Sequence, residues 1–243
     1  MRIIVRAVLA AMLAAAVARV VHLASPFDLH EATKSLSAFL HVYGAIYGTL
    51  LAFLIFVVWG QFVAAEAGVA REAKALQELA ALCRAGRRDG CEEVLQPIRE
   101  YARIAVGSEW KGLAEGKPTP AADQAFLAIQ TAVLRSSAST EAEELARATI
   151  IRVAERAAAL RAERVAVSIT RIPPTLWATL VFASGLLCFS IGLLDAEPLA
   201  STYMTAGMTL VVVLLLGVIA DMDNPFDGTF NASRVPMEAL KHL

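Results

Sequence analysis

The sequence predicts an all-α, polytopic membrane protein with four transmembrane helices and a helical cytoplasmic domain inserted between the second and the third. Hydrophobic residues make up 57% of the chain and charged residues 19%, whereas soluble domains average about 45–50% and about 25%. Two stretches of 23 residues, 172–194 and 198–220, carry no charge. As helices they are roughly 34 Å long, enough to cross a hydrocarbon core of about 30 Å. Before them, residues 64–172 have apolar residues at the three- and four-residue spacing of an α-helix.

The first predicted transmembrane helix covers residues 1–24. An arginine-bearing start, an apolar run and the small residues Ala16-Val17-Ala18 also resemble a signal peptide with its cleavage site. As an uncleaved helix, the segment has Arg6 and Arg19 near opposite ends, where long side chains reach the headgroups. We favour the uncleaved helix because four spans place both long charged segments on one side of the membrane.

The second predicted transmembrane helix covers residues 39–63, within 31 uncharged residues from 35 to 65. Gly44, Gly48 and Ala52 recur at four-residue spacing, a pattern that allows helix backbones to approach closely in lipid. This pattern fits packing within the chain or contact between copies of an oligomer, and both interpretations stay open.

The third and fourth predicted helices, residues 173–194 and 198–220, form an antiparallel hairpin because only three residues separate the uncharged stretches. Basic residues precede the first and third predicted helices and follow the second and fourth. The positive-inside rule therefore places these four helix ends in the cytoplasm. The basic residues are Arg2, Arg6, Arg71, Lys74, Arg161, Arg164, Arg171, Arg234 and Lys241. We therefore expect a multi-pass protein of the bacterial inner membrane with both termini cytoplasmic.

The predicted cytoplasmic domain covers residues 64–172 and begins as a continuation of the second transmembrane helix. Its first apolar seam steps by 4, 3, 4 and 3 residues through Val69, Ala73, Leu76, Ala80 and Cys83. The glycine-rich, charged residues 84–90 end that helix. A second helix is expected over residues 92–115, and a third begins with Thr119 as N-cap and Pro120 at the first helical position.

A long helix is predicted to start at Thr140, because Thr140 and Glu143 have the spacing of a capping box. Its seam again alternates 4 and 3 and includes two arginines. The seam is Ala146, Ile150, Val153, Ala157, Leu160, Arg164, Val167 and Arg171. Residues 221–243 are predicted to form a cytoplasmic tail.

Sequence motifs give no sign of an enzyme. The 22 basic and 23 acidic residues nearly balance, which disfavours a nucleic-acid-binding protein. No phosphate-binding loop, nucleophile elbow or zinc-protease motif occurs, and the four histidines are dispersed. We predict no catalytic residue, no cofactor and no metal site.

An acidic cluster directly follows the fourth predicted helix and includes Asp221 and Asp223. Acidic residues at a helix C-terminus oppose the helix dipole, so local helix stability does not explain them. Arg171 begins the third helix at the same expected membrane depth. We predict an interfacial ion pair between Arg171 and Asp221 or Asp223 that holds the hairpin together.

Three segments resemble the bacterial bestrophin-like membrane family, also described as a domain of unknown function. They are residues 47–74, residues 99–116 and, above all, residues 221–240 (DMDNPFDGTFNASRVPMEAL), which contain the pattern Asp-x-Asp-x-Pro-Phe-x-Gly. The resemblance extends from about residue 39 to residue 240. It implies kinship with bestrophins, which are pentameric anion channels with four transmembrane helices and a helical cytoplasmic part.

The resemblance implies a homo-oligomer around a pore for a small inorganic ion. In such a ring, one stripe of the second helix would offer an apolar lining that gates by dewetting, or would face neighbouring helices. The stripe is Gly44, Gly48, Leu51, Ile55 and Val58. Rings of Asp221 and Asp223 favour cations, whereas rings of Arg164 and Arg171 favour anions.

Two functional hypotheses follow from the sequence. The first is an oligomeric ion channel, with an anion as the implied permeant ion. The second is a non-conducting membrane adaptor whose helical cytoplasmic domain binds a protein partner. It is favoured by the heptad seams and by the lack of Asp, Glu, Lys and Arg within the second, third and fourth predicted spans. In both hypotheses the lipid bilayer surrounds the predicted spans.

Overall fold

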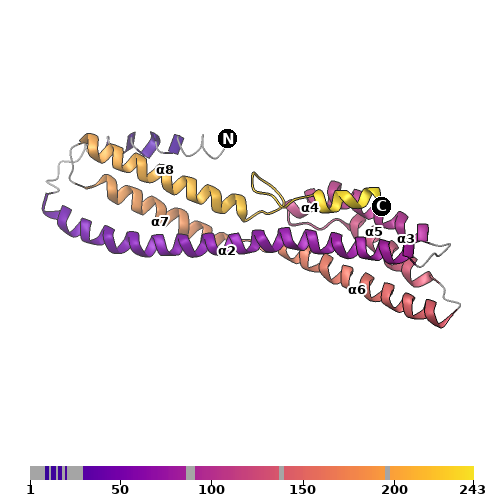
Figure 1. Ribbon diagram of the computed structural model, residues 1–243. Helices are drawn as coiled ribbons and strands as arrows, with labels where there is room; N and C mark the ends of the chain where they lie inside the picture. Colours follow the sequence, from indigo (N-terminus) through magenta and orange to yellow (C-terminus); the bar gives the residue numbers. More distant parts are fainter. Residues whose placement is uncertain are drawn as a thin grey trace. The chain divides into compact units, whose positions relative to one another are not determined.

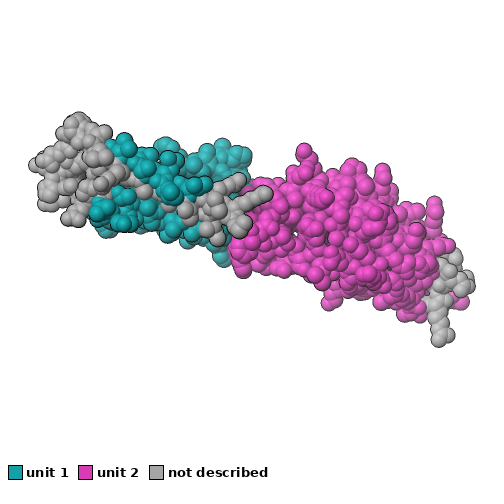
Figure 2. Space-filling model, turned by 90° about the horizontal axis from the view of Figure 1, so that it is seen from above, with its two compact units in different colours: residues 1–58, 172–220 teal, residues 59–171, 221–243 magenta. Residues whose placement is uncertain are grey.

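The structure is a computed structural model that describes residues 9–10, 12–14, 16–17, 20, 30–85, 91–136, 140–194 and 198–243. The chain divides into two compact units (Figure 2). Unit 1 consists of Met1–Val58 and Ile172–Ala220, and unit 2 consists of Trp59–Arg171 and Asp221–Leu243. The described residues form helices joined by short connections, in agreement with the predicted all-α class.

Unit 1 contains the apolar helices. Within the described residues, three helices are long and apolar enough to cross a membrane: Leu36–Ala85, Pro174–Gly192 and Leu199–Met222. They belong to α2 (His30–Ala85), α7 (Pro174–Gly192) and α8 (Pro198–Met222). The predicted first span, residues 1–24, lies mostly outside the described residues, although its described residues are helical. The four-span topology therefore stays a prediction.

Within unit 1, α7 and α8 lie beside the first part of α2 (Figure 1). The hydroxyl of Tyr43 donates to the main-chain carbonyl of Ala183 at 2.8 Å, and the hydroxyls of Tyr47 and Ser184 share a hydrogen bond. These polar contacts hold the facing sides of α2 and α7 together.

Unit 2 is a helical bundle around the second part of α2. It contains α3 (Cys91–Ile104), a π-helix η1 (Ala105–Glu109), α4 (Trp110–Ala114), α5 (Pro120–Arg135) and α6 (Glu141–Ile169). The C-terminal α9 (Val235–Glu238) and η2 (Ala239–His242) complete it (Figure 1). All five residues of the first predicted seam are buried, which confirms that α2 continues into the bundle core. In the second seam Ile150, Val153, Ala157, Leu160 and Arg164 are buried, whereas Ala146 is exposed.

The helix starts follow the predicted caps. The capping box of Thr140 and Glu143 is confirmed by hydrogen bonds in both directions. Thr119 is the N-cap of α5 with Pro120 next to it, but its hydroxyl bonds the main-chain carbonyl of Ser108 instead of capping the helix.

Two parts of unit 2 differ from the sequence expectation. The helix expected over residues 92–115 is interrupted by the π-helix, whose wider turn shifts the register so that both Glu109 and Trp110 are buried. Residues 221–243, expected as a tail, belong to unit 2 and bury Phe226, Met237 and Leu240 in its core. Apolar side chains in this segment make burial more favourable than solvation.

Candidate functional site

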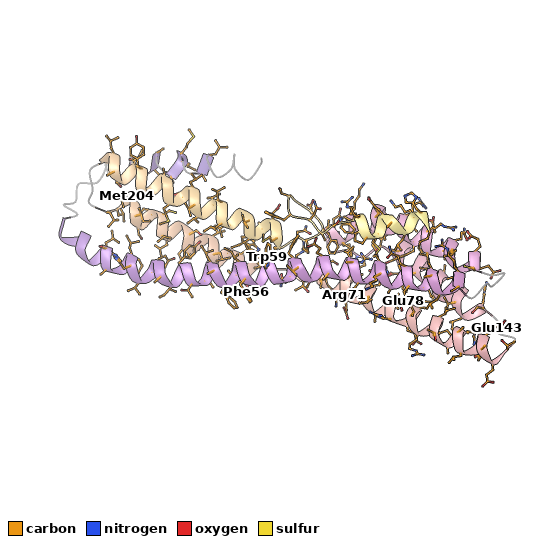
Figure 3. All side chains as sticks on the ribbon, in the orientation of Figure 1. Phe56, Trp59, Arg71, Glu78, Glu143 and Met204 are labelled. Carbon is orange, nitrogen blue, oxygen red and sulfur yellow. The ribbon has the colours of Figure 1, made fainter. Side chains whose placement is uncertain are left out.

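The first candidate site is the exposed face of α2 in unit 1. Its large apolar residues are Phe39, Val42, Ile46, Phe53 and Phe56, whose exposed fractions are 46%, 64%, 65%, 61% and 75%. Their spacing of 3, 4, 7 and 3 residues places them on one side of a helix. Phe56 lies on the side of α2 away from α7 and α8 (Figure 3). We call these five residues the α2 face.

The stripe predicted from the sequence lies elsewhere on α2. Leu51 is 5% exposed and Val58 is fully buried, and Ile55 is half-buried. Gly44 and Gly48 line a groove among α2, α7 and α8, where a Cβ atom at either position would meet no heavy atom within 4 Å. Leu51 and Val58 thus pack inside the protomer, and the two glycines make no close helix contact there. A role of the stripe as a pore lining stays a prediction.

The second candidate site is a buried ionic cluster in unit 2, centred on Arg164. The Arg164 guanidinium donates to Glu72 at 2.6 Å and to Glu109 at 2.7 Å, and to the Tyr101 hydroxyl at 3.0 Å. Arg164, Glu72, Glu109 and Tyr101 are at most 1% exposed. The phenol of Tyr101 in turn donates to Glu72. The cluster therefore joins α2, α3, the π-helix and α6 at one point.

A second arginine balances the charge of this cluster. Arg161 pairs with Glu109 at 2.7 Å and with Asp123 of α5 at 2.8 Å. Its guanidinium also lies over the rings of Tyr101 and Phe126 at 5.7 and 5.6 Å, which is cation–π distance. Two arginines thus face the two buried glutamates.

The electrostatics of the cluster keep Arg164 charged. Burial by itself lowers the pKa of the Arg164 guanidinium, but the attraction of Glu72, Tyr101 and Glu109 outweighs it and raises the pKa well above its ordinary value. Burial, followed by the charge of Glu72, raises the pKa of Tyr101 well above its ordinary value, so its phenol stays protonated. Arg164 is therefore a charged side chain whose charge is balanced by carboxylates inside the bundle.

Sequence reasoning identified Arg164 but not its partners. Glu72 is three residues after Val69 and four residues before Leu76, so it borders the predicted seam. That spacing is the signal that would have placed a carboxylate beside the buried seam of α2, but it does not identify Arg164 as the partner of Glu72. The π-helix that turns Glu109 inward has no comparable signal.

The third candidate site joins the start of the hairpin to the acidic segment after α8. The Arg171 guanidinium donates to the main-chain carbonyl of Asp223 and to the Asn224 side-chain oxygen at 2.8 Å. The Asn224 amide donates to the carbonyl of Ala114 at 2.9 Å. Burial lowers the pKa of Arg171, opposed by Asp223 and Asp227. Arg171 is thus held beside Asp223 by main-chain and amide oxygens.

Asp221 has a different set of partners. Its carboxylate accepts hydrogen bonds from the backbone amides of Thr229 at 3.0 Å and Phe230 at 2.7 Å. Gly228, directly before Thr229, has φ +86°, and a Cβ atom there would overlap the Asp221 carboxylate. The acidic segment is therefore a folded loop closed by Asp221, and no ion pair joins Asp221 to Arg171 among the described residues. A pair between Arg171 and the Asp223 carboxylate stays a prediction.

The same loop is anchored by an aromatic contact. The rings of Phe226 and Trp110 meet edge to face, with centroids 5.1 Å apart, and the Arg234 guanidinium lies 5.1 Å from the centre of the Trp110 ring. Phe226 is 2% exposed and Trp110 1%. These contacts give a structural role to the Pro-Phe-x-Gly part of the pattern, because the phenylalanine fills the core and the glycine permits the turn.

We expect Asp221→Ala to lower the free energy of unfolding by about 1.5–3 kcal/mol, the value of hydrogen bonds to a charged group. Asp227→Ala, in the same loop but exposed, is the matched control and should change stability by less than about 0.5 kcal/mol. Thermal unfolding of the detergent-solubilised variants measures the difference. Equal unfolding midpoints for the two variants would show that the carboxylate does not close the loop.

No metal site emerges from the described ranges, which contain no group of three His, Cys, Asp or Glu side chains placed to hold an ion.

Comparison with known proteins identifies one family. Residues 30–237 match the family described as the Bestrophin-like domain. No curated protein matches the sequence.

The fold is similar to crystal structures of a bacterial bestrophin homologue from Klebsiella pneumoniae. In one, the sequences are 11% identical, the TM-score is 0.75 and the match covers 98% of this chain and 96% of that chain. In another, the corresponding values are 11%, 0.74, 98% and 98%. A crystal structure of a membrane protein is 12% identical, with TM-score 0.75 and coverage of 98% and 96%. At this identity the likeness concerns the fold alone.

Proposed function

Because the chain belongs to the bestrophin-like family, we propose that it forms an oligomeric ion channel in which several copies surround a pore. The α2 face of each copy lines this pore. The resemblance to bestrophins implies an anion, and an anion is the permeant ion that we propose. The proposed location is the bacterial inner membrane, with both termini in the cytoplasm.

The observation that carries this proposal is the α2 face itself. It is a row of large apolar side chains on a helix with no charged residue between 35 and 65, and α7 and α8 leave it uncovered. Around an axis, such side chains form successive apolar rings, and an apolar constriction can gate ions by losing its water. Phe53 and Phe56, the two phenylalanines at the C-terminal end of the α2 face, are the proposed constriction.

Rings of Arg164 or Asp221 contribute little to ion selectivity in the proposed channel. Arg164 is neutralised by Glu72 and Glu109 in the core of unit 2, and Asp221 is bound by backbone amides. Neither group is available to face a permeating ion. Conduction would then be controlled mainly by the width and wetting of the apolar rings.

We expect the double variant Phe53→Ala/Phe56→Ala to raise chloride flux through liposomes containing the protein by about tenfold, which corresponds to ~1.4 kcal/mol removed from the barrier. Phe182→Ala is the matched control, since Phe182 is 73% exposed on α7 and lies outside the α2 face. A flux assay with chloride, and with a large organic anion in its place, measures the change and the selectivity.

The size of the detergent-solubilised particle tests the assembly separately. A monomer without flux, or equal flux in the phenylalanine variants of α2 and α7, would contradict the proposed pore.

A non-conducting adaptor is the second candidate function. The heptad seams of the protein are buried within unit 2, so they are not free to bind a partner. A different surface favours the adaptor. Leu127 and Leu134 of α5 are each 60% exposed, and Leu127 borders a groove lined by residues of α3 and α5. An intact oligomer without flux, together with a protein that co-purifies with the wild type but not with Leu127→Ser, would favour the adaptor.

A further inference from the structure

We propose that unit 1 binds the ester-linked acyl chain of a membrane phospholipid in a cavity between α7, α8 and the N-terminal segment. The cavity volume is about 410 Å³, within the range of small-molecule sites. Its lining is almost entirely apolar and includes Leu13, Val181, Phe189, Val212, Val213 and Leu216. This inference does not depend on ion conduction and goes beyond it.

The length of the cavity matches a single acyl chain. Its lining runs along α7 from Val181 to the C-cap residue Leu193 and along α8 from Thr205 to Leu216. At about 1.5 Å per residue these stretches are roughly 16–18 Å long. One leaflet contributes half of a hydrocarbon core of about 30 Å, so a chain from one leaflet has a similar length.

Two threonines that line the cavity have hydroxyls without the partners that threonines in the other apolar helices have. Within the described part of the chain, the Oγ1 atoms of Thr205 and Thr209 have no hydrogen-bond partner, although these residues are only 3% and 8% exposed. By contrast, Thr49 in α2 and Thr179 in α7 each donate to the carbonyl four residues earlier, at 2.8 and 3.0 Å. Buried hydroxyls are normally hydrogen-bonded, so two unpaired ones indicate a ligand with an acceptor oxygen.

The position of these hydroxyls favours an ester carbonyl at one end of the ligand. Thr205 and Thr209 lie in the half of the cavity nearest to the connection between α7 and α8, where Ser201 bonds the carbonyl of Gly192. The other half is lined by Val181 and Leu216 and by Ser184, whose hydroxyl is already bonded to the Tyr47 hydroxyl and to the carbonyl of Leu180. No charged side chain lines the cavity, so a neutral ester fits better than an ionised carboxylate. The acyl tail would extend away from the hydroxyls along the apolar half.

Gly185 offers a way to fill this cavity. It lines the cavity, and a Cβ atom added to it would meet no heavy atom within 4 Å. Gly207 on α8 has the same open surroundings but does not line the cavity. Gly185→Leu and Gly207→Leu therefore add the same side chain inside and outside the site.

The test uses the full chain in lipid nanodiscs that contain a phospholipid with a photoactivatable diazirine in one ester-linked acyl chain. After illumination, mass spectrometry measures labelling of the α7 and α8 cavity residues as a share of all labelling. We expect strong labelling in the wild type and in Gly207→Leu, and a decrease of about tenfold, or ~1.4 kcal/mol, in Gly185→Leu.

The hydroxyls are tested with the nearly isosteric variant Thr205→Val/Thr209→Val, whose result does not depend on whether Gly185→Leu folds. Thr205→Val/Thr209→Val should reduce the same labelling about two- to tenfold, as expected for loss of hydrogen bonds to a carbonyl, whereas Thr175→Val/Thr179→Val should not. An ether-linked probe, which lacks the carbonyl, should label the wild type no better than the Thr205→Val/Thr209→Val variant.

Three results would overturn the proposal. One is equal labelling in folded Gly185→Leu and Gly207→Leu. Another is unchanged labelling in Thr205→Val/Thr209→Val, which would leave water as the partner of the hydroxyls. The third is a change in oligomer size in Gly185→Leu with labelling kept, which would show that a second copy fills the cavity.

Discussion

Arg164→Met is expected to lower the free energy of unfolding by roughly 3–5 kcal/mol, the usual cost of removing one partner from a buried ion pair. Methionine replaces much of the volume of the arginine side chain, so most of the loss comes from charge. The carboxylates of Glu72 and Glu109 would stay in a core where they are fully buried, and Glu72 would lose its charged partner. The midpoint of thermal unfolding in detergent, followed by helical circular dichroism, measures the effect.

Arg156→Met is the matched control on the same helix. Arg156 forms a pair with Glu78 at 3.7 Å in which the side chains are 64% and 46% exposed, and such surface pairs contribute about 0–1 kcal/mol. Adding Glu72→Gln to Arg164→Met should recover at least about 1 kcal/mol, because it removes a buried charge without a partner. A loss in Arg164→Met no greater than that of the control would contradict the cluster.

Trp110→Ala is expected to cost about 3–5 kcal/mol, as do other truncations of a large aromatic side chain in a core. Trp110 is 1% exposed, and its ring is covered by Phe226 on one edge and by Arg234. The alanine variant should therefore also loosen the loop after α8. Thermal unfolding measures the loss, and limited proteolysis at residues 221–234 reports on the loop.

Trp59→Ala serves as the control, since Trp59 is 50% exposed and should lose less than about 1 kcal/mol. A double-mutant cycle of Trp110→Phe with Phe226→Leu isolates the contact between the rings. We expect a coupling of about 0.5–1.5 kcal/mol. Additive effects of the two substitutions would mean that the rings only fill space.

Hydropathy, helix capping and periodicity, which depend only on residues close together in the sequence, were sufficient to predict the helices and several of their ends. The uncharged stretches predicted α7 and α8 because chain length and hydropathy alone decide whether a segment can cross a bilayer. The capping box at Thr140 was correct since its hydrogen bonds lie within four residues. The seam from Val69 to Cys83 was correct because helical periodicity depends only on spacing along the chain.

Residues that meet across the bundle were harder to assign. The seam spacing identifies Arg164 as a residue that faces the bundle. Its partners Glu72 and Glu109 are 92 and 55 residues away in the sequence, and no local pattern links them to it. In the acidic segment, the sequence predicts that Asp221 or Asp223 pairs with Arg171. In the structure Asp221 instead binds the amides of Thr229 and Phe230, because a turn through Gly228 brings these amides to the carboxylate.

The sequence by itself determined that this protein is helical, that it contains apolar helices long enough for a membrane and that it resembles the bestrophin-like family. Only the tertiary structure decided which side of α2 is covered, because Leu51 and Val58 differ from Phe53 and Phe56 in what packs against them and not in hydrophobicity. It likewise decided that Arg164 pairs with two buried glutamates and that residues 221–243 fold into unit 2. The physical reason is that hydropathy and caps act between near neighbours, whereas burial and charge pairing depend on partners that only the folded chain brings together.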